Sequence, residues 1–313
     1  MIYPKQIILE SCDLCNLSCR GCYRLQDPSM IANTVMDWNL WKRIVDSLTW
    51  KPMVCAFSHG EPFLDPLFHE RLEYLAQREH MVDFATNGTV ERPDVLEVIS
   101  RNTKYLHQVI VSLDGLYSTT REGYRGVTPA QVMTPLETIS SLLRIKEKDP
   151  SFKVGVSMVQ NGQDWDERER FIVHWLKQGC DLVLVRRHLS SVPLEKPYPK
   201  STCHYLDGWI MTISANGKVR LCDRYMNTRW VGDCREKTPL EIFNDEPYAS
   251  YRRFFPVETC VTCPQPYSGR GFYGKVHLKD DSFSCYFSQD YYNDMFSKEL
   301  VKKGLSWGGG ELQ

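Results

Sequence analysis

The chain has 313 residues, of which 42% are hydrophobic and 25% charged, enough for one large α/β domain and a smaller one. Its formal net charge of -1 argues against a general binder of nucleic acids or of membrane surfaces. No apolar run reaches the roughly 18 residues that span a bilayer, and no charged-then-apolar signal region opens the chain.

Twelve cysteines occur in the chain. A small secreted protein would use so many thiols in disulfides. A large chain without an export signal more often uses them as metal ligands in a reducing compartment. We therefore expect a cytoplasmic protein with metal sites.

The first predicted element is a short buried strand over Lys5–Glu10, which leads into a loop of closely spaced cysteines. Cys15, Cys19 and Cys22 follow the spacing C-x3-C-x2-C. Three such thiolates can hold three irons of a 4Fe–4S cube and leave the fourth iron open for chemistry. The alternative is a structural zinc site with Cys12 as fourth ligand, but zinc sites usually close with a second ligand pair, which this segment does not offer. The spacing favours iron–sulfur.

Strands and helices alternate along the following part of the chain. Further strands are predicted at residues 53–57, 81–85, 108–113, 152–159 and 182–186. Helices are predicted from Asp37 onward and at 67–78, 93–101, 134–147 and 165–178. The fourth helix is expected to open at the capping box Thr134–Glu137. Six strands that alternate with helices predict an α/β fold of parallel β/α units.

Polar residues follow several of these strands at their carboxyl ends, where chemistry is usually found in parallel α/β folds. They are the cysteine loop, Glu61, Asn87, Ser112 and Arg186. Because residue type alone singled them out, their common position after strands indicates one functional rim.

The pattern changes after Ser190, where proline and lysine crowd residues 193–200, which we interpret as a linker. Residues 209–221 predict a β-hairpin with Asn216-Gly217 as a two-residue turn. A second capping box, Thr238–Glu241, begins a short helix.

The predicted organisation has four parts. Residues 1–192 form the large α/β domain, 193–200 the linker, 201–288 a small α+β domain, and 289–313 a C-terminal helix with a flexible tail.

Four motifs follow the cysteine loop in order. They are Gly60-Glu61-Pro62, Thr86-Asn87-Gly88, Ser112-Leu113-Asp114-Gly115 and Tyr124-Arg125-Gly126. Each alone would be an ordinary turn. Together with C-x3-C-x2-C and the aromatic residue after it, they resemble the radical S-adenosylmethionine (radical SAM) enzymes over residues 5–190. His59 stands where the family's GGEP motif has its first glycine. The resemblance implies a partial (β/α)6 TIM-like barrel.

The resemblance also implies a cofactor chemistry. In this family the open iron chelates SAM, and one electron cleaves SAM to a 5′-deoxyadenosyl radical that abstracts hydrogen from carbon. Cys15, Cys19 and Cys22 would then hold the SAM-binding 4Fe–4S cluster. The implied SAM contacts come from the four motifs and from the aromatic residue beside the cluster: Tyr23, Gly60, Glu61, Pro62, Asn87, Ser112, Asp114 and Arg125.

The second domain carries four further cysteines, Cys203, Cys222, Cys260 and Cys263. Their arrangement resembles the twitch domain, a shortened SPASM domain, in which such cysteines ligate one auxiliary 4Fe–4S cluster. The alternative is a zinc ribbon, because two sulfur pairs also suit zinc. A cluster closed by four thiolates cannot bind SAM, so its expected role is to exchange an electron with a substrate radical.

Candidate catalytic residues remain on the rim and in the second domain. Arg186, Arg187 or His188 is a candidate base for deprotonating a substrate radical, and the alternative is an anion-binding or solvated pair of arginines. Cys234 and Cys285 are candidate hydrogen-atom donors, and the alternative is that both are small buried hydrophobic residues.

The resemblance therefore implies a radical SAM enzyme that dehydrogenates or epimerises a small polar natural product such as a sugar or an aminocyclitol. A ribosomal peptide or a modified nucleobase is the alternative substrate. No peptide-binding domain precedes the first strand, which disfavours the peptide. We expect a reducing partner such as flavodoxin or ferredoxin, and neither a membrane nor a nucleic acid as partner. The non-enzymatic alternative is a zinc-binding interaction protein.

Overall fold

One sheet runs through the whole described part of the protein. The computed structural model describes residues 1–20, 22, 24, 31–160, 165–187, 210–222, 230–253 and 284–288. The strands of these segments form a ten-stranded sheet in the order β10-β6-β5-β4-β3-β2-β1-β7-β8-β9. None of the helices in these segments combines the length and apolar character needed to cross a membrane.

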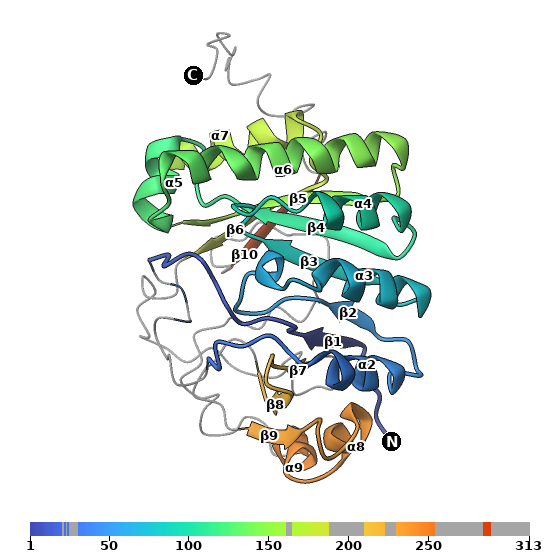
Figure 1. Cartoon of the computed structure of the whole chain (residues 1–313). Helices are drawn as coiled ribbons and strands as arrows, with labels where there is room; N and C mark the ends of the chain where they lie inside the picture. The colour runs from blue at the N-terminus through green and yellow to red at the C-terminus, as the bar shows by residue number, and fades with distance from the viewer. Residues whose placement is uncertain are drawn as a thin grey trace.

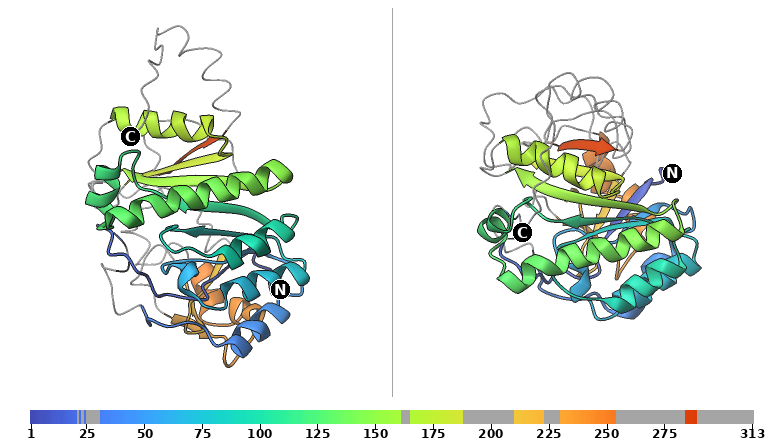
Figure 2. Two further views of the ribbon diagram at one scale, coloured as in Figure 1. Left: turned by 45° about the horizontal axis from the view of Figure 1, so that its top comes forward. Right: turned by 90° about the horizontal axis from the view of Figure 1, so that it is seen from above.

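The first six strands are all parallel, as the alternating pattern predicts. They are β1 (Gln6–Leu9), β2 (Met53–Cys55), β3 (Val82–Thr86), β4 (Leu106–Ser112), β5 (Lys153–Gln160) and β6 (Leu182–Arg187). The connecting helices are α2 (Trp38–Asp46), α3 (Phe68–Gln77), α4 (Pro93–Arg101), α5 (Ser118–Arg125), α6 (Pro129–Lys148) and α7 (Trp165–Lys177). Figures 1 and 2 show α2, α3, α4 and α6 side by side against the sheet. The α/β fold is therefore the parallel-strand sheet of a partial TIM-like barrel.

The helix-facing side of the sheet is the hydrophobic core. Leu9 and Val54, from neighbouring strands, pack with Trp41 of α2 and with Phe68 and Leu72 of α3, and all five are at most 2% exposed. Alternating residues of a strand point to opposite faces, so Ile8 and Glu10 face away from this core. Both faces of β1 are buried, since Ile8 is 6% exposed and Leu9 1%, as expected for a strand inside a parallel sheet.

The helix expected to begin at Thr134 begins one and a half turns earlier, and that prediction is wrong. A capping box of Thr128 and Gln131 opens α6, and Pro129 takes its first turn. Pro135 lies inside the helix. An interior proline costs about 3 kcal/mol. Burial of the following turns, which contain Ile139 at 0% exposure, offsets this cost and keeps the helix continuous.

Strands of the predicted second domain extend the same sheet. β7 (Ile210–Ile213) pairs in parallel with β1, and β8 (Lys218–Arg220) and β9 (Trp230–Asp233) continue antiparallel beyond it. The helices α8 (Pro239–Asn244) and α9 (Tyr248–Arg253) follow, and α8 begins at the predicted capping box. The two predicted domains are thus joined by backbone hydrogen bonds. The predicted linker and C-terminal helix lie outside the described residues.

The β7–β8 hairpin has a longer turn than the sequence predicts. The Ser214 carbonyl accepts from the Gly217 amide at 2.8 Å, and the Ser214 amide donates to the Lys218 carbonyl at 2.9 Å. The loop between Ser214 and Lys218 therefore has three residues, not two. Gly217 has a φ of +78°, the left-handed conformation that ends three-residue hairpin loops. The glycine was identified correctly, and its position in the turn was wrong.

The last described strand, β10 (Ser284–Ser288), pairs antiparallel with β6 at the far edge of the sheet. It covers the edge of the barrel strands with the last residues of the predicted second domain, 201–288. The sequence did not predict β9, β10, α5 or α9, because each is short and lacks a clear hydrophobic period.

A buried ion pair fastens α3 to the start of α2. The Arg71 guanidinium lies 2.7 Å from Asp65, and both side chains are at most 1% exposed. Arg71 also donates to the Met36 carbonyl at 2.6 Å and lies over the rings of Trp38 and Trp41. The Arg71 charge is therefore paired inside the core and two of its three nitrogens donate hydrogen bonds, whereas its Nη1 has no partner among the described residues.

Arg71→Met should lower the free energy of unfolding by about 3–5 kcal/mol, because it leaves the Asp65 carboxylate buried without its cation. Urea unfolding followed by circular dichroism measures this. The matched control is Arg78→Met, which removes a pair with Asp46 whose side chains are 45% and 46% exposed and should change stability little. Equal stabilities of the two variants would contradict the assignment.

Candidate functional site

The cysteine loop begins where β1 ends, at the carboxyl edge of the parallel strands. Residues beyond Ser11 run beside the segment that leads into α2. The Met36 amide donates to the Ser11 carbonyl at 2.7 Å, and the Asp13 amide donates to the Thr34 carbonyl at 3.1 Å. The Asp13 carboxylate accepts from the amides of Ala32 and Thr34 at 2.7 and 2.6 Å. Backbone pairing therefore holds the start of the loop in place.

The three closely spaced cysteines are half-buried free thiols. The Cys22 amide donates to the Cys19 carbonyl at 3.1 Å, and the Arg20 amide donates to the Tyr124 carbonyl at 2.9 Å. Burial raises the pKa of the Cys15 thiol, and it raises the pKa of Cys19 to about 12. Because metals bind thiolates, loading this loop must release protons. Tyr23 lies outside the described residues.

Gly60 lets the loop after β2 approach the cysteine loop directly. A Cβ at Gly60 would lie 2.1 Å from the Cys12 carbonyl oxygen and 2.6 Å from Asp13 Cα. The next amide, of Glu61, donates to the Leu14 carbonyl at 2.7 Å. No side chain fits between these two loops, so glycine is required there.

The Glu61 carboxylate points inward and is 2% exposed. One oxygen accepts from the Phe63 amide at 3.0 Å and from the Thr86 hydroxyl at 2.6 Å. The other accepts from the Asn87 amide at 2.6 Å. Burial raises the pKa of Glu61, although these hydrogen bonds lower it. Glu61 thus ties the loop after β2 to the end of β3, while Pro62 begins a short 3-10 helix, η2 (Pro62–Leu64).

A second buried ion pair continues this network to β4 and α5. Arg125 donates to Asp114 at 2.8 Å and to the Asn87 carbonyl at 3.1 Å. The other Asp114 oxygen accepts from the Val159 amide at 2.8 Å. Burial opposes the charge of Arg125, but Asp114 and Cys19 outweigh it and raise its pKa. The guanidinium therefore remains charged beside the cysteine loop.

Side chains on the rim complete the connections. The Asn87 side chain donates to Asn16 of the cysteine loop at 3.0 Å, and Asn16 donates to the Thr89 hydroxyl at 2.9 Å. The Ser157 hydroxyl donates to Ser112 at 3.2 Å. The structure therefore brings the cysteine loop and all four motifs of the sequence together at one end of the sheet.

The sequence analysis missed two buried charged residues beside this site. Glu10, at the end of β1, and Arg220, in β8, are both 0% exposed. The signal for Glu10 was available, because a carboxylate directly after the apolar run Ile7-Ile8-Leu9 has to find partners. No local signal marked Arg220, whose burial depends on the pairing of β8 with β7.

The other candidate residues are more scattered. Arg186 and Arg187 end β6 on the rim side, and Cys285 lies opposite Val185 in the β10–β6 register. Cys222 is half-buried just after β8. The remaining candidates lie outside the described residues: His188, Cys203, Cys260 and Cys263.

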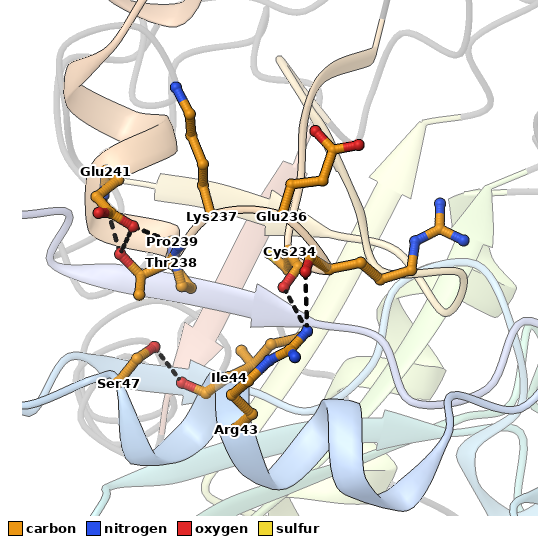
Figure 3. Close-up of a pocket in the computed structure, with 10 residues that line it drawn as sticks. Arg43, Ile44, Ser47, Cys234, Glu236, Lys237, Thr238, Pro239 and Glu241 are labelled. Atoms are coloured by element: carbon orange, nitrogen blue, oxygen red, sulfur yellow. Dashed lines mark hydrogen bonds between the residues drawn. The ribbon is translucent and has the colours of Figure 1, made fainter.

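Cys234 is 3% exposed and packs in the core, where burial raises the pKa of its thiol to about 12. Its carbonyl accepts from Arg43 at 3.1 Å. This contact borders a cavity of about 170 Å³ between α2 and the segment leading into α8 (Figure 3). The geometry matches the alternative of a structural thiol, and the proposed hydrogen-donor role has no support from this position.

The donor set of the cysteine loop fits a cluster held by three thiolates. Its thiols are partly accessible, none forms a disulfide, and the Gly60 loop packs against the backbone of Cys12 and Asp13 just before them. Each iron of a cube takes one protein sulfur, so these ligands serve separate atoms. Within the described segments, no three His, Cys, Asp or Glu side chains are grouped as ligands of a single metal ion.

Comparison with known families identifies this arrangement. The radical SAM superfamily matches residues 9–173, more than half of the chain and the whole stretch that carries the motifs described above. The chain belongs to the radical SAM superfamily. Residues 203–264 match the SPASM iron–sulfur cluster-binding domain.

Individual relatives are distant. A tungsten-containing aldehyde ferredoxin oxidoreductase cofactor-modifying protein of Pyrococcus furiosus is 22% identical over 315 aligned residues, covering 83% of this chain and 87% of that protein. SuiB of Streptococcus suis, solved with the precursor peptide SuiA, gives a TM-score of 0.64 at 16% identity, covering 84% and 70% of the two chains. BtrN, solved with AdoMet and 2-DOIA, gives 0.50 at 14% identity, covering 80% and 86%. The solved structures show a shared fold.

Membership in the radical SAM superfamily defines the cofactors. The protein uses SAM and a SAM-binding 4Fe–4S cluster, and its SPASM domain carries an auxiliary iron–sulfur cluster. The cofactor prediction is thereby confirmed at the level of the domains, and the zinc-binding interaction protein is excluded. Which cysteine holds which iron remains a prediction.

Gly60→Ala should displace the cysteine loop, because its Cβ has no room beside Cys12 and Asp13. We expect less iron per chain after anaerobic reconstitution and SAM binding weaker by about tenfold or more. The matched control is Gly123→Ala in α5, where the added Cβ meets nothing within 4 Å. Alanine there should raise stability by about 0.5–1 kcal/mol. Normal iron content and SAM affinity in Gly60→Ala would refute the close approach.

Proposed function

We propose that this radical SAM enzyme is an oxidoreductase or epimerase that acts on a small polar substrate such as a sugar or an aminocyclitol. When bound, the cluster and SAM supply a 5′-deoxyadenosyl radical, which takes hydrogen from a substrate carbon. The observation that carries the proposal is the convergence of the cysteine loop and the four motifs through buried hydrogen bonds at one rim.

The chain's own residues would hold SAM and the cluster in this proposal. Cys15, Cys19 and Cys22 are the proposed ligands. The backbone of Gly60 and Pro62 and the rim residues Tyr23, Asn87, Ser112 and Asp114 are the proposed SAM contacts. The carboxylates of Glu61 and Asp114 and the guanidinium of Arg125 are hydrogen-bonded to other parts of the rim, so we propose that these three side chains also position the loops.

The match of residues 203–264 to an iron–sulfur cluster-binding domain supports an electron transfer step. Cys222 follows β8, which lies two strands from β1 in the continuous sheet. Adjacent strands are about 4.8 Å apart, so β8 and β1 are about 10 Å apart across the sheet, and because β8 is antiparallel to β7, the chain from Arg220 to Cys222 runs toward the amino end of β1. We propose that Cys203, Cys222, Cys260 and Cys263 hold the auxiliary cluster, which would take an electron from the substrate radical. Loss of an electron from the substrate radical favours dehydrogenation, with Arg186, Arg187 or His188 as the proposed base. If the reaction is an epimerisation, Cys285 is the proposed hydrogen-atom donor.

A peptide substrate is the second candidate, and one comparison favours it: SuiB, solved with a precursor peptide, matches with a higher TM-score than BtrN. Anaerobic incubation with deuterated sugars, deuterated aminocyclitols and deuterated peptides distinguishes the candidates. Deuterium should appear in 5′-deoxyadenosine, detected by mass spectrometry, only with the correct class. We propose a cytoplasmic reductant such as flavodoxin or ferredoxin for these assays.

Replacing Cys15, Cys19 or Cys22 by alanine should abolish formation of 5′-deoxyadenosine under reducing, anaerobic conditions, because each variant removes one iron ligand. Liquid chromatography of the quenched reaction measures the product. The control is Cys12→Ala, a buried thiol three residues earlier. It should keep iron and SAM cleavage, whereas equal loss in Cys12→Ala would indicate a fourth ligand on this cluster and refute the open iron.

The double variant Cys260→Ala/Cys263→Ala should reduce iron from about eight to about four per chain, since it removes two ligands of one of two cubes. It should still cleave SAM but lose the turnover of substrate. Cys180→Ala, a buried core thiol, is the control and should keep both clusters. Unchanged iron in the double variant would contradict the ligand assignment, and unchanged turnover would contradict the role of the auxiliary cluster.

A further inference from the structure

A buried carboxylate lies directly behind the loop that contains Gly60. One oxygen of Glu10 accepts from the His59 amide at 2.6 Å and from the Gly60 amide at 3.1 Å. Its other oxygen has no hydrogen-bond partner among the described residues. Glu10 therefore fixes the backbone of two successive residues just before Glu61.

The imidazole of His59 connects this loop to the second domain. Its Nδ1 lies 2.9 Å from the Ser58 hydroxyl and 2.9 Å from Arg220 Nη1. A guanidinium can only donate, so Nδ1 accepts and the ring proton is on Nε2. The neutral imidazole thus receives a charge-assisted hydrogen bond from a strand more than 150 positions away.

Register in the sheet places Arg220 against β1. Thr212 of β7 pairs with both Ile8 of β1 and Arg220 of β8. Side chains of directly paired residues lie on the same face of a sheet. Arg220 is also held from the other side, because its guanidinium lies 5.1 Å from the ring of Trp230 in β9. The sheet edge contributed by the second domain therefore determines where this cation lies.

Electrostatics join these three residues. Burial raises the pKa of Glu10 to about 7, and Arg220 is the largest influence that lowers it. The other groups that face Glu10 are Asp13 of the cysteine loop, which raises this pKa, and His59, whose amide lowers it. Arg220 thus favours the ionised carboxylate, which is the stronger acceptor for the two loop amides.

We propose that Glu10, His59 and Arg220 are positioning residues through which the second domain sets the shape of the SAM-binding loop, so that SAM affinity depends on β8. This inference rests on the proposed role of residues 60–62 in SAM binding. It also explains the departure from the GGEP motif, because a glycine at position 59 could not receive the Arg220 bond. Arg220 lies in β8 and pairs with Thr212 of β7.

Arg220→Met should weaken SAM binding to the cluster-loaded, substrate-free protein by about tenfold, because it removes a charge-assisted hydrogen bond of the loop. Anaerobic equilibrium dialysis with labelled SAM measures the dissociation constant. Arg220→Lys, which keeps the charge, should recover part of the affinity. Arg43→Met is the matched control, because Arg43 also bonds to the second domain, at the Cys234 carbonyl, but lies beside the cavity in Figure 3.

His59→Ala removes the imidazole and keeps Cβ, and His59→Gly restores the residue of the family motif, so both test the proposal even if Arg220→Met loses its fold. Each should weaken SAM binding to a similar degree. The double variant His59→Gly/Arg220→Met should bind SAM no more weakly than the single variant with the lower affinity. Both changes remove the same contact, so their effects should not add. Additive losses would overturn the proposed connection, as would wild-type affinity in both single variants.

The pH dependence gives a second readout. SAM affinity of the wild type should increase as pH rises through about 7, because Glu10 becomes ionised. In Arg220→Met the increase should move to higher pH, since the cation that lowers the Glu10 pKa is gone. Titration of SAM itself is common to both proteins and cancels in the comparison. An unshifted profile would overturn the inference, whereas a wild type that never binds SAM would overturn the proposed function instead.

Discussion

The rim of this protein is organised by the hydrogen bonds that the buried carboxylate of Glu61 needs. A charged group removed from water has to find hydrogen bonds, and Glu61 finds them in η2 and at the end of β3. The Asn87 amide donates one of these bonds. The Asn87 carbonyl accepts from Arg125, and the Asn87 side chain donates to Asn16. Each motif thereby provides hydrogen-bond partners for a polar group of another motif, and their loops cannot move independently.

The buried ion pair of Arg125 and Asp114 meets the same need of buried charges for partners. Arg125 and Asp114 are both at most 5% exposed and lie between α5 and the end of β4. Paired burial keeps a positive charge close to Cys19 without exposing it to solvent. Buried hydrogen bonds and this ion pair therefore hold the motif loops rigidly beside the cysteine loop. This rigidity is what a site for radical chemistry requires, because a misplaced reactive group would react with its own protein.

The second domain is structurally part of the sheet and does not stand apart as a separate module. β7 lies beside β1 in register from Gln6 to Leu9, and β8 then brings Arg220 to His59 in the loop after β2. Backbone pairing fixes the position of Arg220, because a register shift of one residue would turn its side chain to the other face of the sheet. The cysteine loop and Cys222 therefore follow two strands, β1 and β8, of one sheet, with β7 between them.

Local chemistry explains what the sequence alone determined. The C-x3-C-x2-C loop, the N-cap of α2 at Asp37, the capping box at Thr238 and the alternation of strands and helices were all readable, because each depends on residues a few positions apart. The start of α6 was not, since Thr128 and Thr134 both offer capping residues and packing of the later turns decides between them. Only the tertiary structure disclosed the contact of Glu10, His59 and Arg220. Residues so far apart in the chain meet through strand order and register, which long-range burial decides and no local pattern encodes.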